Sequence, residues 1–463
     1  MDINQYRRNY LSSGRSAFET AVSTTDLYTA CADRRKLGRR AHHFNTKLTV
    51  QPKPTNQRSS GRCWLFAALN MVRNRMMVEK KLDSGFQLSQ NHLFFWDKFE
   101  RANYFLRKEV ELSKKDNMGK EGEKVPDRLW DELYKTPLQD GGQWTMVVNL
   151  VKKYGLVPQS VYRDSHHSTH SRPLNRLLNH KLREWGNHLH SMDMSLTRSV
   201  DRFIDKCMEQ VYQLLSLTLG QPIHPDEEFT WEYTDKKGGV HSVTTTPLDF
   251  YTKQSGMNLD DYVSVVHDPR NEYGTKMTVD HLGNLYGKPG AEYHNLSMPQ
   301  MERLAADMIS SNTAVWFGCD MGPFRNPTAS LMDPEVFNYQ GVLGVPVLKL
   351  DKENRMYTQD SLLTHAMVFT AVHLDEKKTT QELDSLDGST VMVERTTRTP
   401  VRWRVENSWG SAGEENGYYT MSRSWFQEYV YEIVAPRKEV MKLINPTKPV
   451  KVLPLWDPMG ALA

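Results

Sequence analysis

Cys63 stands in the stretch Q-R-S-S-G-R-C-W (residues 57–64), directly ahead of a run with helical periodicity. A cysteine in the first turn of a helix faces unpaired backbone N–H groups and the positive end of the helix dipole, and both lower the pKa of its thiol. Gly61 allows the backbone to approach a ligand closely. The pattern predicts a nucleophilic thiol, although a lone cysteine is often just a small buried hydrophobic residue.

A thiol nucleophile needs a base, a group that orients the base, and donors for an oxyanion. His365, in L-T-H-A-M-V-F-T-A, is the candidate base, and Asn407, in E-N-S-W-G, can accept its imidazole N–H. Trp409 is placed to shield that hydrogen bond from water. Gln57 offers a side-chain amide to the oxyanion beside the backbone N–H of Cys63. These residues predict acyl transfer through an acyl-enzyme, a chemistry that calls for no metal and no cofactor.

Two kinds of element must position these side chains. After Cys63, apolar residues recur at three- and four-residue spacing, which predicts an amphipathic helix with one buried face; they are Leu65, Phe66, Leu69, Val72 and Met76. After about residue 310 the pattern changes to short segments rich in branched or aromatic residues, which predicts strands; these are residues 314–317, 365–373, 401–406 and 418–421. The sequence therefore predicts an α+β protein of two facing halves.

Other segments give further local predictions. Residues 191–220 have the periodicity of a helix that ends at Gly220, with Cys207 on its buried stripe. Residues 229–251 read as a hairpin. The segment 97–124 is dense in charges of both signs, which is typical of a solvated helical arm.

Composition excludes several classes of protein. The chain has 463 residues, of which 38% are hydrophobic and 25% charged, so it is neither collagen-like nor wholly disordered. Its net charge is only +3, which argues against a protein that coats nucleic-acid phosphates. Four cysteines stand far apart, and no signal-peptide or membrane-spanning pattern is present. We expect a reducing, cytoplasmic setting.

The motifs around the predicted site carry a specific resemblance. The sequence resembles the papain-fold cysteine peptidases, and among them the bleomycin hydrolase family. The papain signature C-G-[SA]-C-[WY] reads S-G-R-C-W here, with Ser60 in place of the first cysteine and Arg62 in place of a small residue. Q-x5-C, T-H-A and E-N-S-W-G extend the resemblance to the other three predicted site residues. D-G-G-Q-W (residues 140–144) resembles the strip that pairs with extended substrate, which implies that Gly141 and Gly142 contact substrate.

The spacing of Cys63 and His365 is about 150 residues longer than in the simple papain arrangement. We therefore expect a papain-like core with large helical insertions. The predicted division is a lead-in (1–50), a helix-rich half (51–164) with a charged insertion at about 100–137, a mainly helical insertion (165–300), a β-rich half (301–440) and an extended tail (441–463).

The resemblance also bears on assembly and on the end of the chain. It implies that inserted helices join six copies into a barrel-shaped homohexamer. It further implies that the tail lies in the active-site cleft, with the carboxylate of Ala463 near the nucleophile. A chain end in the groove blocks one side and offers a negative charge to the free amine of a substrate, which converts an endopeptidase groove into an aminopeptidase site.

The resulting prediction is a cytosolic cysteine aminopeptidase that cleaves N-terminal residues of peptides and amide bonds such as that of bleomycin. Two alternatives stay open at this point: a ring-shaped scaffold that binds peptides or single-stranded nucleic acid, and an acyl transferase that uses an amine instead of water. His166, His167 and His170 have a spacing that can hold a metal, but their neighbours read as a loop and we predict no metal site. The basic cluster at residues 34–40 reads as solvated surface rather than a nucleic-acid site.

Overall fold

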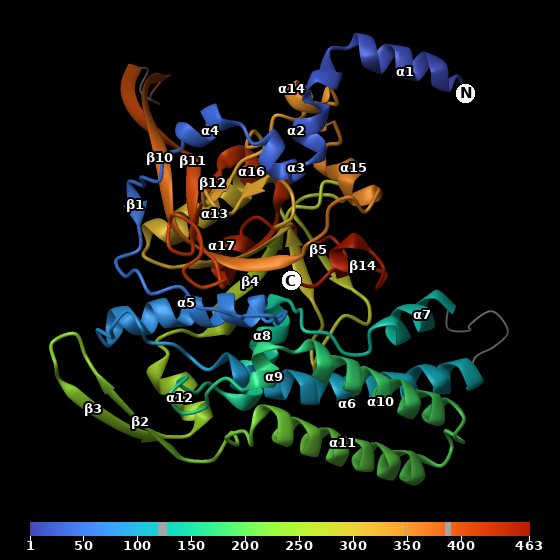
Figure 1. Cartoon of the computed structure of the whole chain (residues 1–463). Coiled ribbons are helices and arrows are strands. Elements are labelled where there is room, and N and C mark those ends of the chain that lie inside the picture. Colours follow the sequence, from blue (N-terminus) through green and yellow to red (C-terminus); the bar gives the residue numbers. More distant parts are fainter. Residues whose placement is uncertain (119–126, 348, 385–389) are drawn as a thin grey trace.

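A computed structural model of the chain describes residues 1–118, 127–347, 349–384 and 390–463. Helices dominate one part of the molecule and a long mixed sheet dominates the other, and α5 (Cys63–Glu79) lies where the two parts meet (Figure 1). The α+β papain-like class predicted from the sequence agrees with this arrangement.

The lead-in consists of short elements that run along the sheet side of the molecule. They are α1 (Ile3–Ser12), η1 (Arg15–Phe18), α2 (Glu19–Ser23), α3 (Leu27–Cys31), α4 (Arg34–Gly38) and β1 (Thr46–Lys47). The first helix contains no buried residue and projects away from the body (Figure 1).

The helix that begins at Cys63 is more deeply buried than its sequence pattern predicts. Fourteen of its 17 residues are buried, so the expectation of one apolar face is wrong. The reason is its position, since it packs against helices on one side and against the sheet strands β7 (Val315–Cys319) and β10 (His365–Asp384) on the other. Buried polar residues on this helix are paired, as in the ion pair of Arg73 with Glu406.

The helical part is built from one long helix and the elements packed on it. They are α6 (Gln90–Met118), α7 (Asp127–Lys135), α8 (Trp144–Tyr154), α9 (His166–Thr169), α10 (Arg172–His190), α11 (Thr197–Leu219), α12 (Pro247–Gln254) and the hairpin strands β2 (Phe229–Thr234) and β3 (Val240–Thr245). The helix predicted at residues 191–220 is present as α11. Gly220 ends it with a φ of 91°, and Cys207 is buried as predicted.

Two predictions in this part need correction. The predicted hairpin is shorter than expected, because Thr246 caps a new helix that has Pro247 in its first turn. The charged segment 97–124 is not a solvated arm at its beginning, since Asp97, Lys98 and Arg101 are buried. They tolerate burial because each is paired, for example Arg101 with Asp97 at 2.8 Å. Residues 119–124 of that segment lie outside the described residues.

The sheet has the strand order β14-β5-β6-β4-β13-β7-β10-β11-β12-β9-β8, with β1 added on β10. Its strands besides β1, β7 and β10 are β4 (Tyr262–Val266), β5 (Thr275–Val279), β6 (Glu292–Asn295), β8 (Arg325–Asn326), β9 (Leu331–Met332), β11 (Thr390–Glu406), β12 (Tyr418–Ser422), β13 (Val430–Pro436) and β14 (Lys451–Leu453). The four strands predicted after residue 310 are confirmed as β7, β10, β11 and β12, and β10 and β11 extend well beyond the predicted bounds.

Shorter helices cover and connect these strands. They are η2 (Leu259–Asp261), α13 (Met298–Ser310), α14 (Tyr339–Leu343), α15 (Lys352–Tyr357), α16 (Arg423–Tyr429), α17 (Arg437–Met441) and η3 (Pro458–Gly460). The tail is extended at β14 but not throughout, because it turns at η3. Within the described residues, no helix combines the length and apolarity needed to cross a membrane. The division of the chain into five segments stays a prediction.

Candidate active site

Cys63 is the first residue of α5, and its side chain is buried, with 3% of the residue exposed. Burial raises the pKa of its thiol to about 11, while the backbone N–H groups of Ala366 and Trp64 act in the opposite direction. The expected lowering of the pKa by the helix start is therefore wrong, because loss of hydration outweighs it here. The contact with Ala366 places the thiol beside the residue that follows His365.

His365 begins β10 and is 5% exposed. Its Nε2 lies 2.9 Å from Oδ1 of Asn407, which directly follows β11. The amide oxygen can only accept, so Nε2 carries the hydrogen and Nδ1 is left to receive a proton. The ring of Trp409 lies 4.9 Å from the imidazole and covers it. The structure thus brings Cys63, His365, Asn407 and Trp409 to one place.

Burial lowers the pKa of His365 to about 4, against the opposing effect of its bond to Asn407. With the thiol pKa at about 11, both groups are neutral at pH 7 in this closed arrangement. A neutral imidazole beside a thiol is the correct starting state for general-base assistance.

Gln57 lies in the loop before the nucleophile, and its side chain bridges two segments. Its Nε2 donates to the carbonyl of Ser60 at 2.6 Å, and its Oε1 accepts from the hydroxyl of Ser408 at 2.6 Å. One hydrogen of the amide is thus used within the loop, and the second remains for an oxyanion. Because Ser408 adjoins Asn407, the same contacts join the nucleophile loop to the strand that orients the imidazole.

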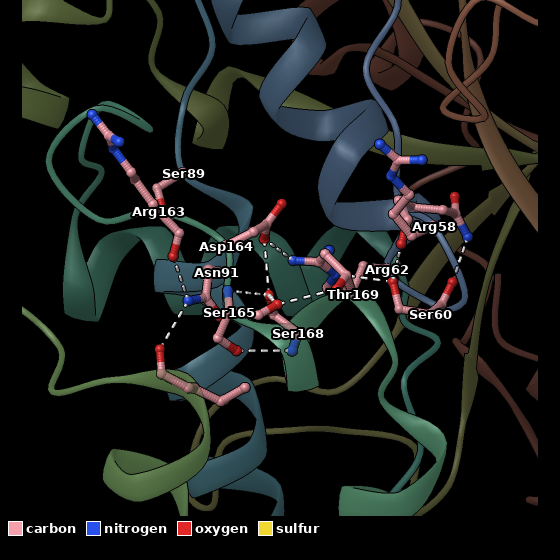
Figure 2. A network of polar contacts seen from close by, with 12 residues as sticks. Arg58, Ser60, Arg62, Ser89, Asn91, Arg163, Asp164, Ser165, Ser168 and Thr169 are labelled. Atoms are coloured by element: carbon pink, nitrogen blue, oxygen red, sulfur yellow. Dashed lines mark hydrogen bonds and ion pairs between the residues drawn. The ribbon is translucent and has the colours of Figure 1, made fainter.

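Arg62 and its partners form a polar network beneath the nucleophile loop (Figure 2). The Arg62 side chain is fully buried; Nη1 donates to Oδ1 of Asp164 at 2.6 Å and Nε donates to the hydroxyl of Ser60 at 3.0 Å. The Ser60 hydroxyl in turn donates to the carbonyl of Gln57 at 2.6 Å, and Asp164 also accepts from Ser168. These contacts were not predicted from the sequence. The one feature of the sequence that pointed to this network is Arg62, which stands in place of a small residue immediately before Cys63.

Asp140 supports the loop from the other side. Its Oδ2 accepts from the backbone N–H of Gly61 at 3.0 Å, and its Oδ1 accepts from Nζ of the buried Lys98 at 2.5 Å. Ser171 donates to it as well. Burial raises the pKa of Asp140, but these donors outweigh burial and hold the pKa well below its usual range. This residue is a second one that sequence reasoning did not single out, although it opens the D-G-G-Q-W motif.

Gly141 and Gly142 lie against the end of the chain. The N–H of Gly142 donates to a carboxylate oxygen of Ala463 at 3.0 Å, and a Cβ at Gly142 would fall 2.5 Å from the ring of Trp64. A Cβ at Gly141 would fall 2.8 Å from Ala463. Glycine is therefore required at both positions. The tail occupies the strip that was predicted to contact substrate. Ala463 is itself 4% exposed.

More of the tail fills the adjacent groove. Nε2 of Gln143 donates to the carbonyl of Ala461 at 2.8 Å. Between Gln143, Leu363 and Tyr431 on one side and the tail on the other, the remaining cavity measures only about 10 Å³. The structure thus brings Ala463 and both glycines together next to Trp64, the residue that follows the nucleophile.

The remaining candidates lie elsewhere. His166, His167 and His170 are on or beside α9, with the rings of His166 and His170 stacked at 4.7 Å. In the part of the chain that the structure describes, no group of three His, Cys, Asp or Glu side chains is arranged to hold a metal. Within the basic cluster, Lys36 is paired with Asp333 and Glu335.

Comparisons with known proteins identify the family of the chain and several relatives. The Peptidase C1-like family model matches residues 1–384 and 388–460. Mouse bleomycin hydrolase is 38% identical over 453 residues, covering 95% of this chain and 93% of that protein. Cysteine proteinase 1, mitochondrial, of Saccharomyces cerevisiae (strain JAY291) is 38% identical over 433 residues, covering 91% and 83%. The crystal structure of PepW from Lactobacillus rhamnosis HN001 superposes with a TM-score of 0.87 at 32% identity and covers 100% of this chain and 98% of that one.

Proposed function

The chain belongs to the Peptidase C1-like family and is a cysteine peptidase. On this premise we propose that it is a cytosolic aminopeptidase that works through Cys63, His365, Asn407 and Gln57. The observation that carries the proposal is the combination of two contacts. The imidazole of His365 is held by Asn407 at 2.9 Å, with the buried thiol of Cys63 against the backbone N–H of the next residue, Ala366. The chain end is hydrogen-bonded to Gly142 at 3.0 Å on the adjoining strip.

The first half of the reaction follows from the roles of these groups. Nδ1 of His365 takes the thiol proton while the sulfur of Cys63 attacks the carbonyl carbon of the first peptide bond. The oxyanion that forms accepts hydrogen bonds from the backbone N–H of Cys63 and from the free amide hydrogen of Gln57. The C–N bond then breaks, and the imidazolium gives its proton to the departing amine.

The second half regenerates the thiol. The N-terminal residue of the substrate is now held as a thioester on Cys63. Water loses a proton to His365 and attacks the thioester carbonyl, and the carbon–sulfur bond breaks as the sulfur recovers its proton. Asn407 keeps the imidazole in one orientation and one tautomer throughout both halves.

The tail sets which bonds are cleaved. With Ala463 on Gly142, the groove is closed on the side that an internal peptide segment would have to cross. The terminal carboxylate offers a negative charge to the amine of the substrate's first residue. Together these effects support removal of single N-terminal residues. The relatives named bleomycin hydrolase support an extension to amide bonds outside ordinary peptides, such as that of bleomycin.

The decisive test compares one peptide with a free amine and with an acetylated amine. We expect the intact chain to release the first residue from the free form and to leave the acetylated form uncut, as read by mass spectrometry. A chain that ends at residue 455 should lose this preference and cut internal bonds. If it retains the same product pattern, the proposed role of the tail is wrong. Loss of all cleavage in Cys63→Ala, with unchanged circular dichroism, is the matching control for the nucleophile.

We further propose assembly into a homohexamer. In support, α1 contains no buried residue, and Ile3, Tyr6 and Leu11 leave more than half of their surface exposed. Apolar side chains gathered in this way on a projecting helix are typical of a surface that contacts another chain. Light scattering should give a particle of six chains of 53.6 kDa each. A monomer at micromolar concentration would contradict the assembly.

The cytosolic location can be tested separately. One relative is named as mitochondrial, so fractionation of cells that carry the tagged full chain is the relevant measurement. We expect the chain in the cytosolic fraction, and co-sedimentation with an organelle would contradict this part of the proposal.

A further inference from the structure

We propose that Arg270 is a positioning residue that locks the C-terminal tail at one depth in the cleft, by clamping Asp457 against the buried carboxylate of Asp268. The inference rests on the proposed function, in which the tail limits cleavage to the first residue. Arg270 belongs to the folded body of the protein and fixes where the tail stops. Selectivity for the first residue then depends on the ion pair of Arg270 with Asp457, six residues before the chain end.

The clamp is a guanidinium shared between two carboxylates. Toward Asp268, Nε donates to Oδ1 at 3.0 Å and Nη2 donates to Oδ2 at 2.8 Å, so the pair is bidentate. Toward Asp457, Nη2 donates to Oδ1 at 2.8 Å and Nη1 lies 3.4 Å from Oδ2. A planar guanidinium that meets two carboxylates in this way has little freedom to rotate, which makes it a precise anchor.

The body side of the clamp is rigid. Asp268 is fully buried, and it also accepts from Nδ2 of Asn271 at 2.7 Å. Its backbone N–H donates to Oδ1 of Asn295, the last residue of β6. The guanidinium of Arg270 lies 5.8 Å over the ring of Tyr357. Burial lowers the pKa of Arg270, but the two carboxylates outweigh burial and raise it above its usual value, so the side chain stays charged.

The tail side of the clamp transmits this position to the chain end. Oδ1 of Asp457 also accepts from the N–H of Met459 at 2.8 Å and so caps the 3₁₀ turn η3. The carbonyl of Met459 accepts from the hydroxyl of Tyr293 at 3.2 Å. The next contacts are those of Ala461 with Gln143 and of Ala463 with Gly142 described above. A fixed Asp457 therefore fixes the turn, and the turn fixes how far the last residues reach.

Without the clamp the tail keeps single hydrogen bonds, the contact of Gly142 with Ala463, the stacking of Arg128 on Trp456 and a three-residue strand pairing. None of these is a bidentate anchor that sets one depth, so we expect the tail to move along and out of the groove part of the time. Two consequences follow. The carboxylate of Ala463 meets the substrate amine less often, which raises KM for substrates with a free amine. The groove also opens part of the time, which admits peptides with a blocked amine.

Hydrogen exchange of the tail measures docking without any catalysis. The experiment uses the full chain carrying Cys63→Ala and follows the peptide that covers residues 456–463 by mass spectrometry. Asp457→Asn keeps the cap on Met459 but removes the charge, and Arg270→Gln removes the donor from the body side. We expect exchange to be about 10-fold faster in both variants, since a charge-assisted contact of this kind is worth roughly that factor or more.

A neighbouring ion pair supplies the matched control. Nζ of Lys448 lies 3.2 Å from Glu272, and both side chains are largely exposed. It joins the base of the tail to the same loop, so Lys448→Gln should leave the exchange of residues 456–463 unchanged. Equal exchange in all three variants and in the parent would overturn the clamp. Melting temperatures identify a variant that is globally destabilised. Asp457→Asn should be destabilised least, because it leaves Arg270 paired with Asp268.

A second readout uses the active chain. For an aminoacyl amide, Arg270→Gln and Asp457→Asn should raise KM about 10-fold with a smaller change in kcat, and both should begin to cut the acetylated peptide. Arg270→Lys, which keeps the charge but not the planar fork, should fall in between. If truncation at residue 455 opens the groove but these variants do not, the clamp is wrong and the proposed function stands. If truncation itself changes nothing, the proposed function of the tail is wrong, and hydrogen exchange still decides the clamp independently.

Discussion

The nucleophile loop (residues 57–62) and the C-terminal tail (residues 456–463) line the same cleft, but they are held in different ways. Two carboxylates hold the loop, because the partly exposed Asp164 binds the buried Arg62 and the largely buried Asp140 binds both Gly61 and Lys98. Single hydrogen bonds and the clamp at Asp457 hold the tail. The loop is therefore anchored by charged partners from several elements, whereas the tail lies in the groove as a strap with one charged anchor.

This difference matches the different demands on the two sides of a peptidase cleft. The thiol, its base and the oxyanion donors must keep fixed distances, and partners from several elements around the loop provide that rigidity. In the proposed function the tail needs only to block and to present a charge, and a segment at the chain end opens locally at lower cost than one tied into the body at both ends. We therefore expect changes at the loop to alter chemistry or stability, and changes at the tail to alter which substrates are cut.

The largest expected effect comes from removing the sulfur. Cys63→Ala should lower kcat for an aminoacyl amide by about 10⁴-fold or more, since removing the nucleophile of a coupled site leaves only the contribution of binding and the oxyanion donors. The tail should stay docked, as judged by its hydrogen exchange. Cys207→Ala, which removes a buried sulfur from α11, is the control and should retain most activity. Substantial turnover by Cys63→Ala would contradict the assignment.

Asp140 tests the loop as a folded unit. Asp140→Asn leaves the buried Lys98 ammonium without its charged partner and should reduce the free energy of unfolding by about 3 kcal/mol at pH 7. Because the folded pKa of Asp140 is lowered, its stabilising effect is present above the unfolded pKa of about 3.9 and is lost as pH falls below it. The difference between variant and parent in urea unfolding should therefore shrink as pH falls below about 4.

The tail offers the contrasting measurement. Asp457→Asn weakens a mostly buried ion pair but leaves Arg270 paired with Asp268, so it should reduce the free energy of unfolding at pH 7 by only about 1 kcal/mol. An equal loss of stability in Asp140→Asn and Asp457→Asn would contradict the proposed difference in how the loop and the tail are anchored.

Thiol reactivity tests whether the strap shields the nucleophile. Burial raises the pKa of Cys63 to about 11, so alkylation by iodoacetamide should rise with pH up to that region in the intact chain. Truncation at residue 455 should expose the thiol, lower its pKa and increase the rate at pH 7 by about 10-fold or more. Labelling of Cys31, measured in the same digest, is the internal control. An unchanged rate for Cys63 after truncation would show that the burial comes from the core alone.

The sequence predicted the chemistry better than it predicted the support. Cys63, His365 and Asn407 stand in short motifs that can be read locally, and the strand and helix periodicities around them predicted the elements that carry them. The structure places them as expected, with His365 and Asn407 at 2.9 Å, while their catalytic roles stay predictions until tested. Local patterns could not reveal the thiol pKa, because it depends on how completely the assembled cleft excludes water.

The roles of the supporting carboxylates could not be predicted from the sequence, for a related reason. Asp140 and Asp164 are 77 and 101 residues from Cys63 in the sequence, and each looks like an ordinary loop aspartate until long-range packing brings Gly61 or Arg62 to it. The same limit explains the misread charged segment, where a dense run of mixed charge suggested a solvated helix. Burial there is possible only because partners such as Asp140 arrive from elsewhere.

The smallest effect on turnover is expected at Asp164, although removing the charge opposite the fully buried Arg62 should also lower the free energy of unfolding by about 3 kcal/mol. Asp164→Asn should loosen the Arg62–Ser60–Gln57 contacts and lower kcat by about 3- to 10-fold with little change in KM, because the oxyanion is bound only in the transition state. Gln57→Ala should act through the same step, so the double variant should cost less than the product of the two single effects. Asp201→Asn, which breaks an exposed ion pair with Arg107 in the same helical part, is the matched control and should change neither constant. If Asp164→Asn instead raises KM and leaves kcat intact, the network under the loop acts on substrate binding, and the division of chemistry to the loop and selectivity to the tail fails.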